Sequence, residues 1–201
     1  MLRSTIGDTM VLFDNQRCEV LEMAGPIRLF VSSSPDLAPE REIVGQAVAE
    51  LPISVGWEIK HTPREGEDAF EALNFVARCD LYLVLLGTDF AAPMGVEWER
   101  AQETGKILLA YRKNVHYSPA AQTHLRRTDV AWVEFDSLQE LKVQVTRALA
   151  QTVLDHGEQL GLHLDDVEAL LGLIKAHEEE SVEPGRRQGA ERGGVILGRG
   201  G

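Results

Sequence analysis

A run of six consecutive apolar residues, Leu81 to Leu86, constrains the fold of this 201-residue chain more than any other feature. No polar residue alternates with the apolar ones, as it would in a strand with one face in water. Such a strand is buried on both faces, which is typical of parallel sheets covered by helices on either side. The sequence therefore predicts an α/β fold with this segment as a central strand.

Four further strands are expected, and helical patterns separate them. They are residues 27–32, 55–60, 107–111 and 131–135. This alternation is the signature of right-handed βαβ units, so we expect a doubly wound sheet of five parallel strands. The mainly apolar segments 27–32 and 107–111 should lie beside 81–86 in the middle of the sheet. The alternating segment 55–60 suits an edge.

Helices are expected between the strands, from the spacing of their apolar residues. They cover residues 39–51 and 67–79, a segment that begins near Gly95, and residues 138–153. In the first of them, Glu40 is predicted to lie away from the apolar face. In the second, Phe70 is predicted to be buried.

The chain is expected to divide into four parts. They are an N-terminal extension (1–25), the α/β domain (26–156), a C-terminal helical appendage (157–183) and a flexible tail (184–201). The tail is rich in Gly and Arg and low in apolar residues, which is typical of disorder. The helix of the appendage is expected to pack outside the five strands or against another copy of the chain.

Composition narrows the classes of partner and compartment. The net charge of -12 disfavours a nucleic-acid surface, which needs clustered Lys and Arg. No run of about 18 apolar residues is present, so no membrane partner is expected. Cys18 and Cys79 are interpreted as reduced thiols, which favours a cytoplasmic protein. His116 and His124 are eight residues apart without a third ligand nearby, so we expect no metal site.

Polar residues gather where the expected strands end. The candidates for substrate binding are Ser32, Ser33, Ser34 and Asp36 after the first strand, and Asp89 after the central strand. Open parallel sheets bind ligands beyond the carboxyl ends of their strands, and hydroxyls with backbone N–H groups can cradle an anion there. The alternative is that Ser34 and Asp36 cap the helix that follows.

Glu97 is the candidate catalytic residue, placed in the first turn of the helix after the central strand. The alternative is a glutamate that only interacts with the positive helix N-terminus. Trp98 is a candidate for substrate binding by stacking, with core packing as the other interpretation. Glu99 lies two positions after Glu97, so it should leave the helix on a different, solvent-exposed face.

The segment Phe30-Val-Ser-Ser-Ser-Pro-Asp-Leu, followed by Glu40-Arg41, closely resembles the opening motif of a TIR-like domain of unknown function. This domain stands at the N-terminus of many bacterial multidomain signalling and defence proteins. The resemblance covers about residues 27–135. It continues through Cys79-Asp80, Leu86-Gly87, the segment from Gly95 to Ala101, and Gly105-Lys106.

The resemblance implies a flavodoxin-like sheet, shared with TIR domains and nucleoside deoxyribosyltransferases. In both groups a glutamate near the start of the helix after the central strand acts at an N-glycosidic bond, and that position is Glu97 here. It implies NAD or a related nucleotide as substrate, no cofactor, and a homo-oligomer or partner domain. The alternatives are a non-catalytic interaction or oligomerisation module and a deoxyribosyltransferase-like enzyme.

The chemistry agrees with the residue type. Cleavage of a ribosyl N-glycosidic bond builds positive charge on the sugar, which a carboxylate beside it stabilises or attacks. An enzyme of this kind needs a pocket at the carboxylate, whereas an interaction module needs an exposed apolar patch. The position of Glu97 relative to a pocket therefore discriminates between the two.

Overall fold

The computed structural model describes residues 25–64 and 66–182. The expectations for the N-terminal extension before Gly25, for Cys18 and for the tail concern residues outside this part of the chain. Cys79 is a buried free thiol. Within the described part, no helix is long and apolar enough to cross a membrane.

Five strands form one sheet in which every neighbouring pair is parallel. They are β1 (Ile27–Ser33), β2 (Trp57–His61), β3 (Leu81–Leu86), β4 (Ile107–Lys113) and β5 (Val133–Phe135). Their order, β2-β1-β3-β4-β5, is that of a flavodoxin-like doubly wound sheet. The predicted fold is therefore confirmed, with β1, β3 and β4 in the middle and β2 at an edge.

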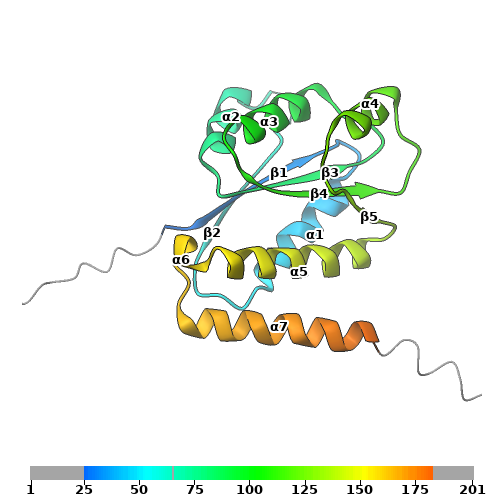
Figure 1. Ribbon diagram of the computed structural model, residues 1–201. Coiled ribbons are helices and arrows are strands. Elements are labelled where there is room, and N and C mark those ends of the chain that lie inside the picture. Colours follow the sequence, from blue (N-terminus) through cyan, green and yellow to red (C-terminus); the bar gives the residue numbers. More distant parts are fainter. Residues whose placement is uncertain (1–24, 65, 183–201) are drawn as a thin grey trace, which may run out of the picture.

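Helices cover both faces of the sheet (Figure 1). They are α1 (Ala38–Ala49), α2 (Ala69–Arg78), α3 (Ala92–Glu103), α4 (Pro119–Arg127), α5 (Leu138–Asp155), α6 (Gly157–Leu160) and α7 (Leu164–Val182). In Figure 1, α2, α3 and α4 lie above the sheet, and α1 and α5 lie below it. All six side chains of β3 are buried. Leu81, Leu83 and Leu85 pack with α1 and α5, whereas Tyr82 and Val84 pack with α2 and α3.

The helix that carries Glu97 begins earlier than predicted. It starts at Ala92 and has a proline in its first turn, where the fixed φ of Pro93 suits a helix start. Glu97 therefore lies in the second turn, and the predicted start near Gly95 was wrong. The side chain projects toward the sheet and is not placed at the helix N-terminus.

Two predicted side-chain orientations were also wrong. Phe70 is 72% exposed, because the buried face of α2 is made by Ala72, Phe75 and Val76. Glu40 is 2% exposed, because its Oε1 accepts a hydrogen bond from the Lys113 ammonium group at the end of β4, at 2.7 Å. A partner distant in the sequence makes this burial tolerable, and periodicity within α1 cannot reveal it.

The C-terminal helix α7 lies outside the layer formed by α1 and α5 (Figure 1) and packs on α5. Leu170 of α7 is completely buried and belongs to the same hydrophobic core as the sheet. At the start of the helix, the Asp166 carboxylate accepts hydrogen bonds from the Ser54 amide at 2.7 Å and the Ser54 hydroxyl at 3.0 Å. It also accepts one from the His163 amide at 3.0 Å. Asp166 thus ties α7 to the loop before β2.

Removal of the Asp166 carboxylate should destabilise the protein. We expect Asp166→Ala to lower the free energy of unfolding by about 1–3 kcal/mol, because the Ser54 and His163 amides lose their acceptor. Asp165→Ala is the matched control, since Asp165 is exposed in the same helical turn, and it should cost less than about 1 kcal/mol. Urea unfolding of both variants measures the difference. Equal losses would show that Asp166 does not anchor α7.

Candidate functional site

The Glu97 carboxyl group lies between α3 and the carboxyl ends of β1 and β2. Glu97 is 2% exposed. The Ser32 hydroxyl donates to Glu97 Oε2 at 2.5 Å, and the Thr62 hydroxyl donates to the same oxygen at 2.9 Å. Ser32 belongs to β1, and Thr62 directly follows β2. The carboxyl group therefore joins one helix to two strands at the rim where ligands bind in sheets of this kind.

The two carboxyl oxygens of Glu97 are in different situations. Thr62 Oγ1 accepts a hydrogen bond from the Ser33 amide at 3.0 Å, so its own proton is directed to Glu97 Oε2. Oε2 thus has two donors. Oε1 is buried and has no hydrogen-bond partner among the residues that the structure describes. A buried polar atom without a partner is costly, and Glu40 Oε2 and the Tyr82 hydroxyl share this condition.

Burial raises the pKa of Glu97 to about 7, and the Ser32 and Thr62 hydroxyls oppose this rise by donating to the charged form. Tyr82 lies beside the carboxyl group. Burial raises the pKa of its hydroxyl, Ser32 acts in the opposite direction, and the neighbouring Glu97 charge raises the pKa further. Glu97 therefore exchanges a proton near neutral pH, which is a property of catalytic carboxyl groups.

Ser34 and Asp36 join the loop after β1 to the loop after β3. The Ser34 hydroxyl donates to the Asp89 carbonyl at 2.6 Å and accepts from the Gly87 amide at 2.9 Å. Asp36 Oδ2 accepts from the Thr88 amide and hydroxyl, both at 3.1 Å. The interpretation that these two residues cap α1 was wrong, because its N-cap is Leu37 and has no side-chain hydrogen bond.

The remaining predicted site residues lie apart from the Glu97 carboxyl group. The Ser33 hydroxyl is buried without a hydrogen-bond partner, and the Ser33 amide donates to Thr62. Asp89 is exposed, and its carboxylate accepts a hydrogen bond from Ser118. Trp98 is 4% exposed and stacks on Trp132 with ring centroids 5.9 Å apart, so it packs in the core.

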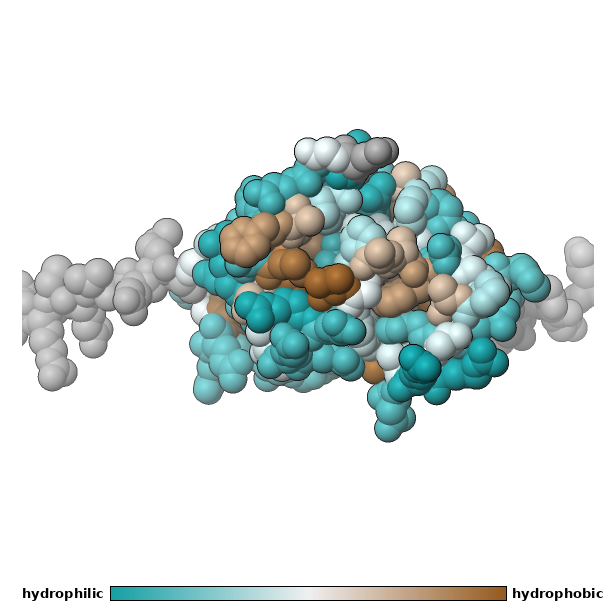
Figure 2. Space-filling view, turned by 90° about the horizontal axis from the view of Figure 1, so that it is seen from above, coloured by the Kyte–Doolittle hydropathy of each residue, from teal (hydrophilic) through white to brown (hydrophobic). Residues whose placement is uncertain are grey.

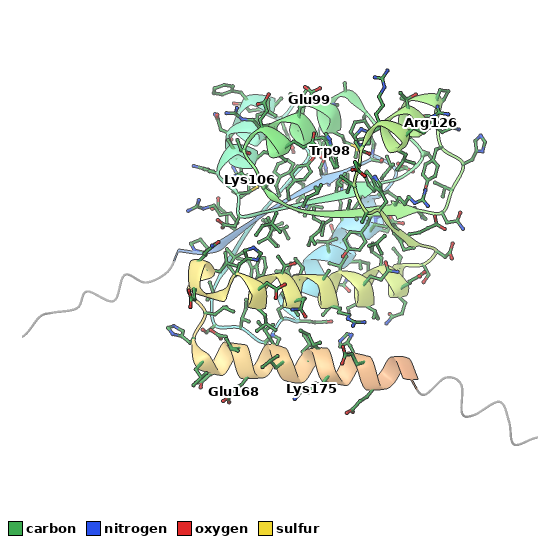
Figure 3. The ribbon with its side chains drawn as sticks, viewed as in Figure 1. Trp98, Glu99, Lys106, Arg126, Glu168 and Lys175 are labelled. Carbon is green, nitrogen blue, oxygen red and sulfur yellow. The ribbon has the colours of Figure 1, made fainter. Side chains whose placement is uncertain are left out.

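Figure 3 shows Glu99 on α3 directed away from the sheet, while Trp98 points toward it. The structure agrees with the predicted exposed face of Glu99. It also separates Glu99 from the buried carboxyl group of Glu97, although only Trp98 lies between them in the sequence.

Thr62 and Tyr82 were not among the predicted site residues. Thr62 follows the expected edge strand, so the rule that ligands bind beyond strand ends applied to it as well. Tyr82 was hidden within the apolar run of the central strand, where only its hydroxyl distinguishes it from its neighbours. Among the described residues, no group of three or more His, Cys, Asp or Glu side chains is placed to hold a metal ion.

A cavity of about 510 Å³ lies beside this site, between the end of β2 and α2. Its lining includes Thr62, whose hydroxyl contacts Glu97, but Glu97 itself does not belong to the lining. The cavity size falls within the range of small-molecule sites. Thr62 is therefore the side chain that connects the cavity with the buried carboxyl group.

No protein-family model and no curated protein matches the chain. Among solved structures, the Clostridium botulinum CMP N-glycosidase BcmB is similar with a TM-score of 0.42 and 15% identity, over 59% of this chain and 96% of that chain. The Flv1 flavodiiron core from Synechocystis is similar with a TM-score of 0.40 and 10% identity, over 79% of this chain and 37% of that chain. At these values neither likeness supports a functional conclusion.

The close approach of Gly87 to Asp36 is testable. A Cβ atom at Gly87 would lie 2.6 Å from both carboxylate oxygens of Asp36. We expect Gly87→Ala to lower the free energy of unfolding by about 1–3 kcal/mol. The loss should shrink in an Asp36→Ala background, where the clash is absent.

Gly45→Ala is the control, because a Cβ there meets no atom within 4 Å, and it should stabilise α1 by about 0.5–1 kcal/mol. A loss that is unchanged by Asp36→Ala would contradict this explanation.

The raised pKa of Glu97 predicts a pH-dependent effect on stability. The folded-state pKa of about 7 exceeds the ordinary value of 4.5, so the folded protein binds more protons than the unfolded chain between these values. Glu97 therefore costs stability increasingly as the pH rises through this range.

Glu97→Gln removes this titration. We expect the free energy of unfolding of Glu97→Gln, relative to the parent protein, to increase by about 2–3 kcal/mol between about pH 5 and about pH 8. Urea unfolding at both pH values measures the change, with exposed Glu99→Gln as the control that should show little dependence. A relative stability that is independent of pH would contradict a buried, proton-exchanging Glu97.

Proposed function

We propose that this protein cleaves the N-glycosidic bond of a nucleotide, with Glu97 acting at the ribosyl carbon. The observation that carries the proposal is the asymmetric environment of its buried carboxyl group. Two hydroxyls hold Oε2, Oε1 has no partner in the described part of the chain, and the pKa is raised to about 7. The resemblance of residues 27–135 to TIR-like domains also supports it, and it implies NAD or a related nucleotide as the substrate.

The proposed reaction is hydrolysis. The C1′–N bond breaks, its electron pair leaves with the base, and C1′ becomes positively charged. The Glu97 carboxylate stabilises this charge through Oε1 while Ser32 and Thr62 keep Oε2 in place. A water oxygen forms the new bond to C1′, and Glu97 accepts the proton that this water releases. Glu97 then passes this proton to a base that left as an anion, or to solvent where the base left neutral. The products are the free base and a sugar with an anomeric hydroxyl group.

The carboxyl group is reached through the cavity beside Thr62. Since Glu97 is 2% exposed, substrate binding must displace side chains at the rim before C1′ contacts Oε1. Exclusion of water from such a site strengthens the interaction between a carboxylate and a positive sugar. The same burial accounts for the raised pKa of the group.

We further propose that the protein is a TIR-like signalling or defence domain in the bacterial cytoplasm. It works as a homo-oligomer or together with a partner domain. These statements rest on the resemblance of the sequence alone.

The second proposal is a non-catalytic interaction module, and the surface formed by α2 and α3 favours it. Phe70 is 72% exposed and Val96 is 51% exposed, and together with Leu73 they line one shallow hollow. Figure 2 shows apolar side chains gathered on this face of the molecule. Exposed apolar patches of this kind mark interaction sites. The absence of Glu97 from the cavity lining agrees with this alternative as well.

Base release separates the two proposals. The purified protein is incubated with NAD, NADP, CMP and cytidine at low and high protein concentration, and free base is measured by chromatography. We expect Glu97→Gln to reduce the rate by at least about a hundredfold, because the neutral amide stabilises less sugar charge. Glu99→Gln should retain the parental rate, since its side chain is exposed on another face of α3.

The outcomes of this experiment are distinct. Equal rates for Glu97→Gln and the parent protein, at matched thermal stability, would remove Glu97 from the mechanism. No base release from any substrate at any concentration would favour the interaction module. Transfer of the sugar to an added second base, in place of water, would identify a deoxyribosyltransferase-like enzyme.

A further inference from the structure

Basic side chains line the cavity next to the Glu97 site. Arg41 of α1, His61 at the end of β2 and Arg64 of the following loop all line it. They come from three segments that the fold brings together at one end of β2.

Acidic residues also line the cavity, but most of them are engaged locally. Glu71 pairs with the Lys60 ammonium group, and Glu67 accepts a hydrogen bond from the Arg64 amide. Asp68 caps α2 by accepting from two backbone amides. By contrast, the guanidinium groups of Arg41 and Arg64 make no ion pair with any residue in the described part of the chain.

The guanidinium groups of Arg41 and Arg64 oppose a positive charge on His61 within this cavity. Burial lowers the pKa of His61, and the charges of Arg41 and Arg64 lower it further, while exposed Glu42 acts in the opposite direction. A bound anion would relieve this repulsion and form charge-assisted hydrogen bonds with both guanidinium groups. Arg is well suited to this task, because its planar fork matches the oxygens of a phosphate group.

We propose that this cavity binds the phosphate group of a nucleotide, with Arg41, His61 and Arg64 as its contacts. The proposal rests on the proposed function and deepens it, since it names the residues that hold the phosphate group of the nucleotide substrate. Thr62 stands between the two sites, because it lines the cavity and its hydroxyl is 2.9 Å from Glu97 Oε2. A phosphate held beside His61 therefore places the attached ribose toward Glu97.

The cavity has room and suitable surface for more than the phosphate. Its volume of about 510 Å³ exceeds that of a single phosphate group, and Ile59, Pro63 and Ala72 add apolar lining. A sugar can pack on such a surface while its phosphate meets the cations. The arrangement combines a few charged contacts with apolar walls, as small-molecule sites do.

The first test measures binding without catalysis. Ribose 5-phosphate, ribose and inorganic phosphate are each titrated into the protein, and the shift of the His61 ring resonances is followed by NMR. We expect ribose 5-phosphate to bind at least about tenfold more tightly than ribose, through charge-assisted contacts. Arg41→Gln combined with Arg64→Gln should abolish most of this preference. Arg126→Gln combined with Arg127→Gln is the matched control, because it removes the same two charges from exposed positions of α4, where Figure 3 labels Arg126.

Three binding results would contradict the proposal or a part of it. Equal affinity for ribose 5-phosphate and ribose would overturn the proposal. Equal affinity for ribose 5-phosphate and inorganic phosphate would overturn its nucleotide part, since the sugar would then contribute nothing. Loss of binding in the α4 control variant to the same degree as in the Arg41/Arg64 double variant would also overturn it, because a general charge effect would explain the result.

The second test keeps this proposal separate from the proposed function. Glu97→Gln should still bind ribose 5-phosphate, since the carboxyl group lies outside the cavity lining. Phosphate binding without base release would contradict the glycosidase and leave the phosphate site intact. Base release that is equally fast for CMP and cytidine, and is unaffected by the Arg41/Arg64 double variant, would overturn the phosphate site and leave the glycosidase intact.

Discussion

The pairing of β3 with β1 and β4 buries Leu81 to Leu86 on both faces of the sheet, and the other elements are arranged around that burial. A strand without a solvent face needs helices on both sides, so α2 and α3 must cover one side while α1 and α5 cover the other. Parallel pairing then places the carboxyl ends of all strands at one rim. The loops that follow β1, β2 and β3 meet there, and the polar side chains they carry come into contact.

The rim is held together mainly by side chains that bond across loops. Ser34 and Asp36 connect the loop after β1 to the loop after β3, and Glu40 joins α1 to Lys113 at the end of β4. These contacts fix the end of β1, where Ser32 meets Glu97. A buried carboxyl group that is only half satisfied costs stability, and such costs concentrate at functional sites. The hydroxyls of Ser32 and Thr62 offset part of this cost at Oε2 and none of it at Oε1.

Much of the architecture was predictable because it depends on hydrophobic periodicity. The apolar run at β3, the alternating edge strand and the αβ rhythm predicted a parallel sheet with β1, β3 and β4 in the middle and β2 at an edge, as observed. The rule that ligands bind beyond the carboxyl ends of parallel strands placed Glu97 and Ser32 at the same rim of the sheet. Thr62 and Tyr82 were not identified, because a threonine in a turn-rich loop and a tyrosine in an apolar strand resemble structural residues. The start of α3 was misplaced, because Pro93 begins the helix before the Gly95 motif.

The sequence by itself determined the fold class, the central position of β3 and the rim at which polar residues collect, since these follow from local pattern and strand direction. Only the tertiary structure decided which polar groups are buried and what they bond. Glu40 is buried because Lys113 reaches it from β4, and Ser34 joins two loops because Gly87 approaches it closely. The raised pKa of Glu97 likewise arises from burial beneath residues distant in the chain. Such properties depend on contacts between segments far apart in sequence, and no local pattern encodes them.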